Sequence, residues 1–418
     1  MSLKTATIEL VLGGHKLLTK NPMTALERRV VASLALLYSV RMLGLFMALP
    51  LLALYAADML GASPLMIGIA LGAYGATQAL LQIPLGWLSD RIGRKPVILA
   101  GLTVFALGSV VAAMAESVAW VAVGRALQGA GAISSSVMAL AADLTSEEQR
   151  TKAMAIIGVS IGASFALALI FGPLLAGFGG LTTVFWMTAI MACLGMLVVV
   201  FGIPTAKGRI HDDVGASPSL VGPVLRDSRL LRLDGSVFLL HFMLTASFLL
   251  VPAAIEGPLG VAREQHWRVY LPVLLASLIA MYPLLRISER FGKPQLALLT
   301  SVLLMPATLS GLFLSQESWV IYTALCLFFA AVNYLEAALP SMVSKAVFAH
   351  GKGTALGVYA TCQFLGAFAG GSIGGYMLQV QGVNGLLVMV LIASALWILL
   401  LMRLPHGQSS FDRVASTD

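Results

Sequence analysis

Long apolar runs follow one another along most of the chain and are separated by short polar segments. A helix needs about 20 mostly apolar residues to cross the hydrocarbon core of a bilayer. The pattern therefore predicts twelve membrane-spanning helices with little soluble mass. We expect them at residues 31–57, 65–87, 96–115, 118–142, 153–177, 182–203, 235–256, 267–287, 295–315, 318–341, 354–379 and 384–403.

The composition agrees with this pattern. Of the 418 residues, 59% are hydrophobic and 11% are charged, whereas a soluble domain has about 25% charged residues. The lipid bilayer is thus the expected environment. The three cysteines, Cys193, Cys326 and Cys362, fall inside apolar segments and show neither a disulfide framework nor a metal-binding spacing. We expect no cofactor and no metal.

The placement of Lys and Arg predicts the orientation. In this span assignment, 22 of the 26 basic residues lie on one side of the membrane. Positive loops face the cytoplasm, so both termini are expected there, as an even number of spans requires. The net charge of +7 lies in short loops and does not indicate nucleic-acid binding.

The longest polar stretch, residues 204–232, divides the spans six and six. We expect a cytoplasmic arm at 1–30, one six-helix half at 31–203, a cytoplasmic linker at 204–232, a second half at 233–403 and a short tail at 404–418. An internal repeat supports the division, because residues 84–94 align with residues 283–293. The second copy is degenerate: Leu285 replaces Gly86 and Glu289 replaces Asp90.

A dense charged segment, Gly86-Trp87-Leu88-Ser89-Asp90-Arg91-Ile92-Gly93-Arg94-Lys95-Pro96, joins the second and third spans. Asp90 and Arg94 have the spacing that places two side chains on one face of a helix end. The two glycines permit close approach and sharp turns. A positive loop alone explains the basic residues but neither the acid nor the glycines. We predict a conformational latch, with charged contacts made in one state and broken in another.

This segment resembles the loop 2–3 signature of the major facilitator superfamily of secondary transporters, G-x-L-S/A-D-R-x-G-R-K. The resemblance implies an all-α membrane protein with twelve transmembrane helices in two six-helix halves around a central cavity. It also implies that an acid at the end of span 4, Asp143, pairs with Arg94. The expected latch comprises Gly86, Asp90, Arg91, Gly93, Arg94, Lys95 and Asp143.

Two further motifs resemble family patterns. Residues 125–131 match R-x-x-Q-G-x-G, which the family associates with proton transfer; the alternative is that Arg125 extends to the membrane surface. Residues 168–177 are similar to the antiporter motif G-x-x-x-G-P-x-x-G-G, with alanine at two glycine positions. This motif implies export, and the alternative is generic packing of small residues. Its candidate residues are Ala168, Gly172, Pro173 and Gly177.

Ionisable groups inside spans are costly and mark candidate functional sites. Glu336 in span 10 is a candidate proton carrier, and His241 in span 7 titrates near neutral pH. Arg41 in span 1 and Arg125 in span 4 complete the candidate proton-coupling set. For Arg41 a structural ion pair is the alternative, and for His241 a structural polar contact. The candidate cavity-lining residues are Tyr38, Phe46, Gln78, Asn333, Tyr359 and Gln363.

Within the superfamily the chain is most similar to bacterial twelve-span drug:proton antiporters. This resemblance implies a monomeric inner-membrane protein that exports small lipophilic molecules against protons by alternating access. The chain contains no G-x-x-x-x-G-K-[ST] motif and no hydrolase motif, so we do not expect an enzyme. Two alternatives remain: a proton-coupled importer of a sugar or other metabolite, and a non-transporting membrane sensor.

Overall fold

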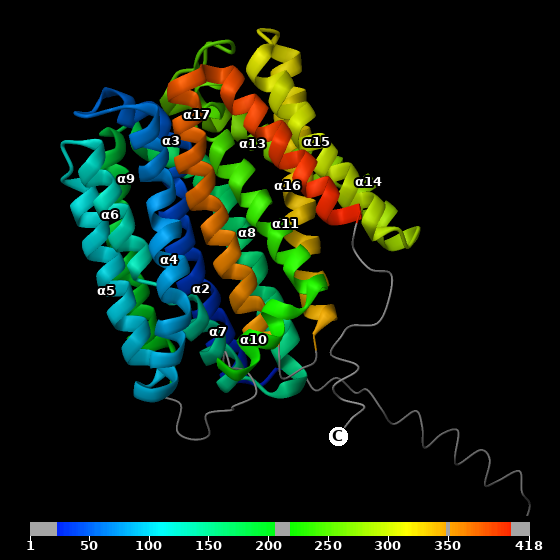
Figure 1. The fold of residues 1–418 in the computed structure, drawn as a ribbon. Helices are drawn as coiled ribbons and strands as arrows, with labels where there is room; N and C mark the ends of the chain where they lie inside the picture. The colour runs from blue at the N-terminus through cyan, green and yellow to red at the C-terminus, as the bar shows by residue number, and fades with distance from the viewer. Residues whose placement is uncertain (1–22, 205–217, 348–351, 403–418) are drawn as a thin grey trace, which may run out of the picture.

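The computed structural model describes residues 23–204, 218–347 and 352–402. These residues form a bundle of long helices (Figure 1). In this described part, ten helices are long and apolar enough to cross a membrane. The twelve predicted spans are all accounted for, because span 4 is divided into two shorter helices and spans 11 and 12 merge into one bent helix.

The first half contains spans 1 to 6. A single 3₁₀ turn, η1, follows α3, and a π-helical turn, η2, follows α9. Its elements are α2 (Ala25–Met47), α3 (Leu49–Tyr55), η1 (Ala56–Asp58), α4 (Pro64–Ile92), α5 (Arg94–Ala113), α6 (Val118–Ala130), α7 (Ser134–Asp143), α8 (Glu147–Ala176), α9 (Gly180–Leu197) and η2 (Val198–Gly202).

The second half contains spans 7 to 12. Within α17, Gly382 has φ 64° and ψ −154°, and Figure 1 shows the helix turning back at the top of the bundle. Its elements are α10 (Pro218–Arg226), α11 (Ser228–Ser247), α12 (Val251–Glu256), η3 (Arg263–Gln265), α13 (Trp267–Ala280), α14 (Tyr282–Leu285), η4 (Arg286–Arg290), α15 (Pro294–Leu314), α16 (Ser318–Ala346) and α17 (Lys352–Met402).

The first span begins earlier than its hydrophobicity predicts. Thr24 and Glu27 form a capping box, in which the Glu27 amide donates to Thr24 Oγ1 at 3.1 Å and the Thr24 amide donates to Glu27 Oε2 at 2.8 Å. Such a box satisfies amides that a helix start leaves free. Residues 25–30 therefore belong to α2 and not to the arm. Residues 1–22, 205–217 and 403–418, which hold most of the predicted arm, part of the linker and the whole tail, lie outside the described residues.

Span 4 is not the single helix predicted at 118–142. It is interrupted between α6 and α7, where Gly131 packs against Gly101 so closely that a Cβ on Gly131 would lie 2.3 Å from the Gly101 carbonyl oxygen. The interruption releases carbonyl groups from helical pairing, and one of them, on Gly131, accepts a hydrogen bond from Arg41 at 3.2 Å. Apolar composition cannot reveal this break, since it depends on the neighbouring helix.

Span 7 also differs from its predicted range of 235–256. It begins at Ser228, where the Asp227 carboxylate accepts hydrogen bonds from the amides of Arg229 and Leu230 at 2.8 and 3.2 Å. It is interrupted between α11 and α12, just before Pro252. Proline has no amide hydrogen and disfavours helical geometry at the preceding residue, which accounts for the interruption.

Glycines bring α4 and α17 into direct backbone contact at the seam between the two halves. A Cβ on Gly68 would lie 2.0 Å from the Gly371 carbonyl oxygen, and one on Gly75 would lie 2.5 Å from the Phe364 carbonyl oxygen. Small residues permit such close helix packing within a membrane. Figure 1 shows α4 and α17 as neighbours in the middle of the bundle.

Candidate functional site

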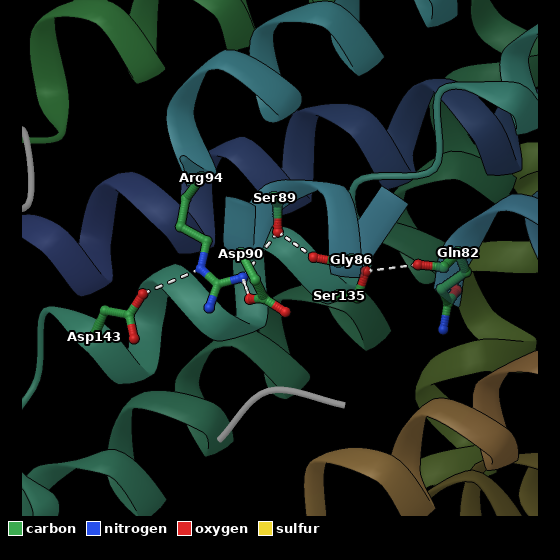
Figure 2. A network of polar contacts seen from close by, with 7 residues as sticks. All are labelled: Gln82, Gly86, Ser89, Asp90, Arg94, Ser135 and Asp143. Atoms are coloured by element: carbon green, nitrogen blue, oxygen red, sulfur yellow. Dashed lines mark hydrogen bonds and ion pairs between the residues drawn. The ribbon is translucent and has the colours of Figure 1, made fainter. Parts of the chain in front are cut away.

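The charged segment between α4 and α5 forms a compact network (Figure 2). Arg94 donates through Nε to Asp143 Oδ2 at 3.2 Å, and its Nη1 forms an ion pair with Asp90. The same Nη1 donates to the Ser89 hydroxyl at 2.8 Å, which donates to the Gly86 carbonyl at 2.6 Å. Arg94 and Asp143 side chains are each 8% exposed. We call Asp90, Arg94 and Asp143 the ionic triad, and their end of the bundle the latch end.

Gly93 places Asp90 and Arg94 in different helices, which corrects the expectation that they share one face of a helix end. α4 ends at Ile92, Gly93 has φ 99°, and α5 begins at Arg94. Side chains with a Cβ rarely adopt a positive φ. The turn at Gly93 therefore sets the direction from which the guanidinium reaches both carboxylates.

Gly86 marks a close approach between α4 and α7. A Cβ at Gly86 would lie 2.8 Å from Ser135 Oγ, and this hydroxyl donates to the Gln82 carbonyl at 2.9 Å. α7 ends at Asp143. The contact between α4 and α7 therefore holds Asp143 within reach of Arg94.

The other two basic residues of the predicted latch lie outside the ionic triad. The Arg91 guanidinium stacks on the Trp87 ring at 3.5 Å from its centroid, and both side chains are exposed. Lys95 is half-buried and has no ion pair among the described residues. In the second copy of the repeat, Glu289 lies in a π-helical turn and likewise forms no ion pair in the described part of the chain.

Arg41 is the centre of a buried polar cluster between α2, α4 and the span 4 interruption. It is 1% exposed, and its Nη2 donates to the Tyr74 hydroxyl at 3.0 Å and to Gln78 Oε1 at 3.1 Å. Its Nη1 lies 3.4 Å from Ser134 Oγ, and its Nε has no partner among the described residues. These partners are neutral. Arg41 therefore forms no interhelical ion pair with any described residue, contrary to the structural alternative considered from the sequence.

Arg125 lies on the other side of Tyr74. Its guanidinium carbon is 5.4 Å from the Tyr74 ring centroid, and its Nη1 donates to Gln128 Oε1 at 3.0 Å. Gln128 in turn donates to Ser109 Oγ at 2.8 Å. Because Arg125 is only 4% exposed, it is buried inside the bundle and does not extend to the membrane surface. The first half thus contains two buried guanidinium groups with neutral partners.

In the second half, Glu336 and His241 lie side by side on facing helices. His241 Nε2 is 3.1 Å from Glu336 Oε1 and 2.8 Å from Gln363 Nε2, while Nδ1 is 3.2 Å from the Val237 carbonyl. The carbonyl favours a hydrogen on Nδ1, so Nε2 accepts from Gln363 when the ring is neutral and can donate to Glu336 when it is charged. The Glu336 side chain is 38% exposed, so water can reach it.

The six predicted cavity residues have different environments. Tyr38 and Gln78 are buried inside the first half, where Tyr38 donates to the Ser134 carbonyl at 2.9 Å. Tyr359 is also buried. Asn333 is half-buried and donates to Ser277 Oγ at 3.2 Å. Phe46 and Gln363 are half-buried as well, and Phe46 meets Phe165 edge-on at 5.2 Å.

The span 5 motif packs against the place where span 1 is interrupted. Ala168, Gly172 and Pro173 are buried, and a Cβ on Gly172 would lie 2.9 Å from the Met47 carbonyl oxygen. Met47 is the last residue of α2. Gly177 differs from the other three, because it is exposed at the end of α8. Three of the four predicted motif residues are therefore buried in the bundle, and Gly177 is not.

Polar contacts between the two halves gather at the end opposite the latch. Arg263 Nη1 is 3.2 Å from Asp58 Oδ2, and the Tyr55 hydroxyl lies 3.4 Å from Glu264 Oε1. In a third hydrogen bond nearby, the Leu65 amide donates to Gln379 Oε1 at 3.3 Å. These three contacts connect the two halves at this end of the bundle. We call this the Arg263 end.

Sequence reasoning missed one buried acid, Asp234 on α11. It is 3% exposed, and its Oδ2 has no hydrogen-bond partner among the described residues. The predicted span began at residue 235, so the acid lay one residue outside it and was not considered as a buried group. An acid directly preceding an apolar run is the signal that would have found it.

The chain belongs to the major facilitator superfamily. The family model matches residues 34–371 and, in a second match, residues 233–416. The chain is therefore a multi-pass membrane transporter with the twelve-helix architecture predicted above, and its relatives are transporters rather than enzymes. A transporter of this fold acts on a small-molecule substrate within a lipid bilayer.

The chain is similar in sequence to several transporters and in fold to a solved structure. It is 42% identical to the Inner membrane transport protein YajR of Escherichia coli (strain K12), over 90% of this chain and 83% of that protein. It is 25% identical to the Multidrug resistance protein MdtH of Cronobacter sakazakii, over 79% and 81%. A bacterial homologue of the human lysosomal transporter Spinster, in an inward-facing and occupied conformation, shares the fold with a TM-score of 0.72 at 15% identity, over 90% and 97%.

Proposed function

We propose that this chain is a proton-coupled antiporter of the bacterial inner membrane, a monomer that exports small lipophilic or drug-like molecules by alternating access. The relative named as an inner membrane transport protein supports the location, and the relatives named as multidrug resistance proteins support the substrate class. The buried, glycine-dependent part of the span 5 motif supports export, because the resemblance associates this motif with antiporters.

The observation that carries the proposal is the contact between Glu336 and His241. Loss of a proton from Glu336 leaves a carboxylate that a charged His241 can pair with at 3.1 Å. When the Nε2 proton of the charged ring passes to the Glu336 carboxylate, that attraction is lost, and the neutral His241 Nε2 can then accept from Gln363. Protonation therefore changes which helix His241 is bound to, α16 or α17. A proton can therefore shift the equilibrium between two packing arrangements of the second half.

The two buried arginines extend the proposal to the first half. Arg41 and Arg125 have neutral partners among the described residues, so each carries an uncompensated charge at considerable cost. We propose that they take part in proton coupling and hold the first half in one arrangement. The electrical part of a proton gradient supplies about 2.3 kcal/mol per charge per 100 mV, which is enough to bias such an equilibrium.

We also propose a role for the ionic triad, which lies at the end of the bundle opposite Arg263. The ionic triad lies wholly in the first half, so it fixes the shape of the latch end rather than joining the two halves. We propose that this shape provides the surface on which the second half closes when the Arg263 end opens. Both termini are proposed to lie on the latch side, in the cytoplasm.

Everted membrane vesicles provide the test. Respiration acidifies the vesicles, a quenched dye reports the pH gradient, and a panel of lipophilic cations, dyes and sugars is added. The proposal expects one or more lipophilic compounds to collapse the gradient in vesicles that contain the wild-type chain, and expects Glu336→Gln to abolish the response. Unchanged substrate-driven proton flux in Glu336→Gln would remove Glu336 as the coupling group.

The same assay separates the alternatives. A metabolite importer responds to a sugar or acid and acidifies right-side-out vesicles when substrate is added outside. A sensor shows no gradient response in either orientation but retains ligand-induced thermal shifts. His241→Gln is the companion variant, because an amide keeps a hydrogen-bonding group of similar reach but cannot carry the charge.

A further inference from the structure

The second half contains a buried carboxyl group that the Glu336–His241 contact does not use. Asp234 is 3% exposed, its Oδ2 has no partner among the described residues, and the ion pairs found in that part of the chain do not include it. A buried ionised carboxylate without a partner is strongly disfavoured. A carboxyl group in this environment therefore either holds a proton or meets a cation.

The surroundings of Asp234 favour a proton. Tyr359 on α17 is 5% exposed, and its hydroxyl is a second buried polar group without a partner among the described residues. This hydroxyl lies close enough to Asp234 and to Glu336 to interact electrostatically with both, and the Cys362 thiol interacts in the same way with Asp234. A metal cation would require several oxygen ligands, and the described residues contain no metal-binding cluster of acids, histidines and cysteines.

The helices align these groups toward the Glu336–His241 contact. Asp234 and His241 are separated by about two turns of α11, which puts them on the same face. Tyr359 and Gln363 are separated by about one turn of α17 and also share a face. Gln363 contacts His241 at 2.8 Å. Along the helix axes, Tyr359 thus lies at a level between Asp234, which is nearer the latch end, and His241 of the proposed coupling site.

We propose that Asp234 is a second proton-carrying group, which exchanges a proton with Glu336 by way of the Tyr359 hydroxyl. The Tyr359 hydroxyl, which makes no hydrogen bond with a described residue in this structure, first turns into contact with both acids. The O–H bond of Asp234 then breaks and its proton passes to the Tyr359 oxygen. The original hydroxyl proton of Tyr359 passes to the Glu336 carboxylate. Asp234 becomes the carboxylate, Glu336 becomes neutral, and no electrons are transferred. The role in transport rests on the proposed function, whereas the presence of a proton on Asp234 does not.

Infrared difference spectroscopy tests the proton without any substrate. Wild-type protein in lipid is taken through a change of pH, and the carbonyl stretch of protonated carboxyl groups is recorded. We expect one such band to be absent in Asp234→Asn and retained in Asp227→Asn. Asp227 provides a matched control, because it is an acid on the same helix start whose asparagine variant keeps the helix cap. An unchanged spectrum in Asp234→Asn would overturn the proposal.

A transport assay tests the route. Proteoliposomes with a trapped pH dye are given ethidium, a fluorescent lipophilic cation, and both net proton flux and ethidium binding are measured. We expect Asp234→Asn to lose the flux and keep the binding, because an amide mimics the protonated acid. We expect Tyr359→Phe to slow the flux while leaving the Asp234 band in place. Wild-type flux in both variants would overturn the route.

The two experiments also separate the possible failures. If the wild-type chain gives no proton flux with any compound of the panel, the proposed function fails, while the infrared band still decides whether Asp234 holds a proton. If Asp234→Asn does not insert into membranes, the proton flux of the Tyr359→Phe variant tests the proposed proton route. Its hydroxyl has no partner among the described residues, so its removal costs little stability.

Discussion

Arg263 and Asp58 form an ion pair across the two halves, with Arg263 Nη1 3.2 Å from Asp58 Oδ2. Arg263 also holds Glu256 of its own half at 3.0 Å and lies over the Tyr55 ring at 5.2 Å. This end of the bundle therefore joins the halves by polar contacts. The Asp58 side chain is 77% exposed, so the pair contributes only about 0–1 kcal/mol. A contact this weak can break in each transport cycle.

Linking the halves at this position is expected to stop transport. Cysteines replace Asp58 and Arg263, and a short thiol-reactive linker joins them in vesicles. If alternating access requires this end to open, cross-linked protein loses substrate flux, and a cleavable linker restores it. Glu256→Cys with Arg263→Cys is the control, since it joins two residues of one half. Full activity in the linked Asp58–Arg263 protein would contradict the requirement.

Arg94→Ala is expected to destabilise the protein by about 3–5 kcal/mol, the typical result of removing one partner from a buried ion pair. The Arg94 and Asp143 side chains are each only 8% exposed, so Asp143 would be left buried without its counter-ion. Thermal unfolding of the purified protein in detergent measures the effect. Lys95→Ala removes the same charge from the next position without breaking the ionic triad. Equal melting temperatures for both variants would show that the buried pair does not stabilise the fold.

Gly172→Leu is expected to cost about 1–3 kcal/mol through overpacking. A Cβ at this position would lie 2.9 Å from a backbone oxygen of Met47, which cannot move aside as a flexible side chain can. Gly158→Leu on the same helix is the control, because a Cβ there meets nothing within 4 Å. Thermal stability in lipid nanodiscs and vesicle transport are compared for the two variants. The prediction is wrong if both variants behave as wild type.

Tyr74→Phe is expected to lower stability by about 1.5–3 kcal/mol, the usual contribution of a hydrogen bond to a charged group. The Tyr74 hydroxyl accepts from Arg41 Nη2 at 3.0 Å, whereas the ring contacts with Arg41 and Arg125 would remain in the variant. Tyr282→Phe is the control, because Tyr282 is 58% exposed and contacts Arg286 through its ring. Denaturation of the two variants in detergent, measured by tryptophan fluorescence, checks this difference.

Sequence reasoning found the spans and the positions of the motifs well. Apolar runs and basic loops depend on the neighbouring residues in the chain and on the bilayer, so they can be read without a fold. The family resemblance supplied the expectation that Asp143 meets Arg94, and the two side chains are in contact at 3.2 Å. It could not supply the turn at Gly93 that separates the Asp90 and Arg94 helices.

The helix interruptions and the partners of Arg41 could not be predicted from the sequence. The break after α6 depends on Gly101 of another helix, and the neutral partners of Arg41 come from α4 and from the break itself. Asp234 was left outside the predicted span because hydrophobicity marks the apolar core of a span and not its capped beginning at Ser228.

By itself, the sequence determined that this protein crosses the membrane repeatedly, that its charges lie mainly in short loops and that a few ionisable groups fall within spans. These features follow from local composition, to which the bilayer responds directly. Only the tertiary structure decided which helices face one another, and therefore that Glu336 meets His241, that Arg41 meets neutral groups and that Asp234 Oδ2 has no partner among the described residues. A buried polar group is defined by what lies opposite it, and residues distant in the chain provide that neighbour.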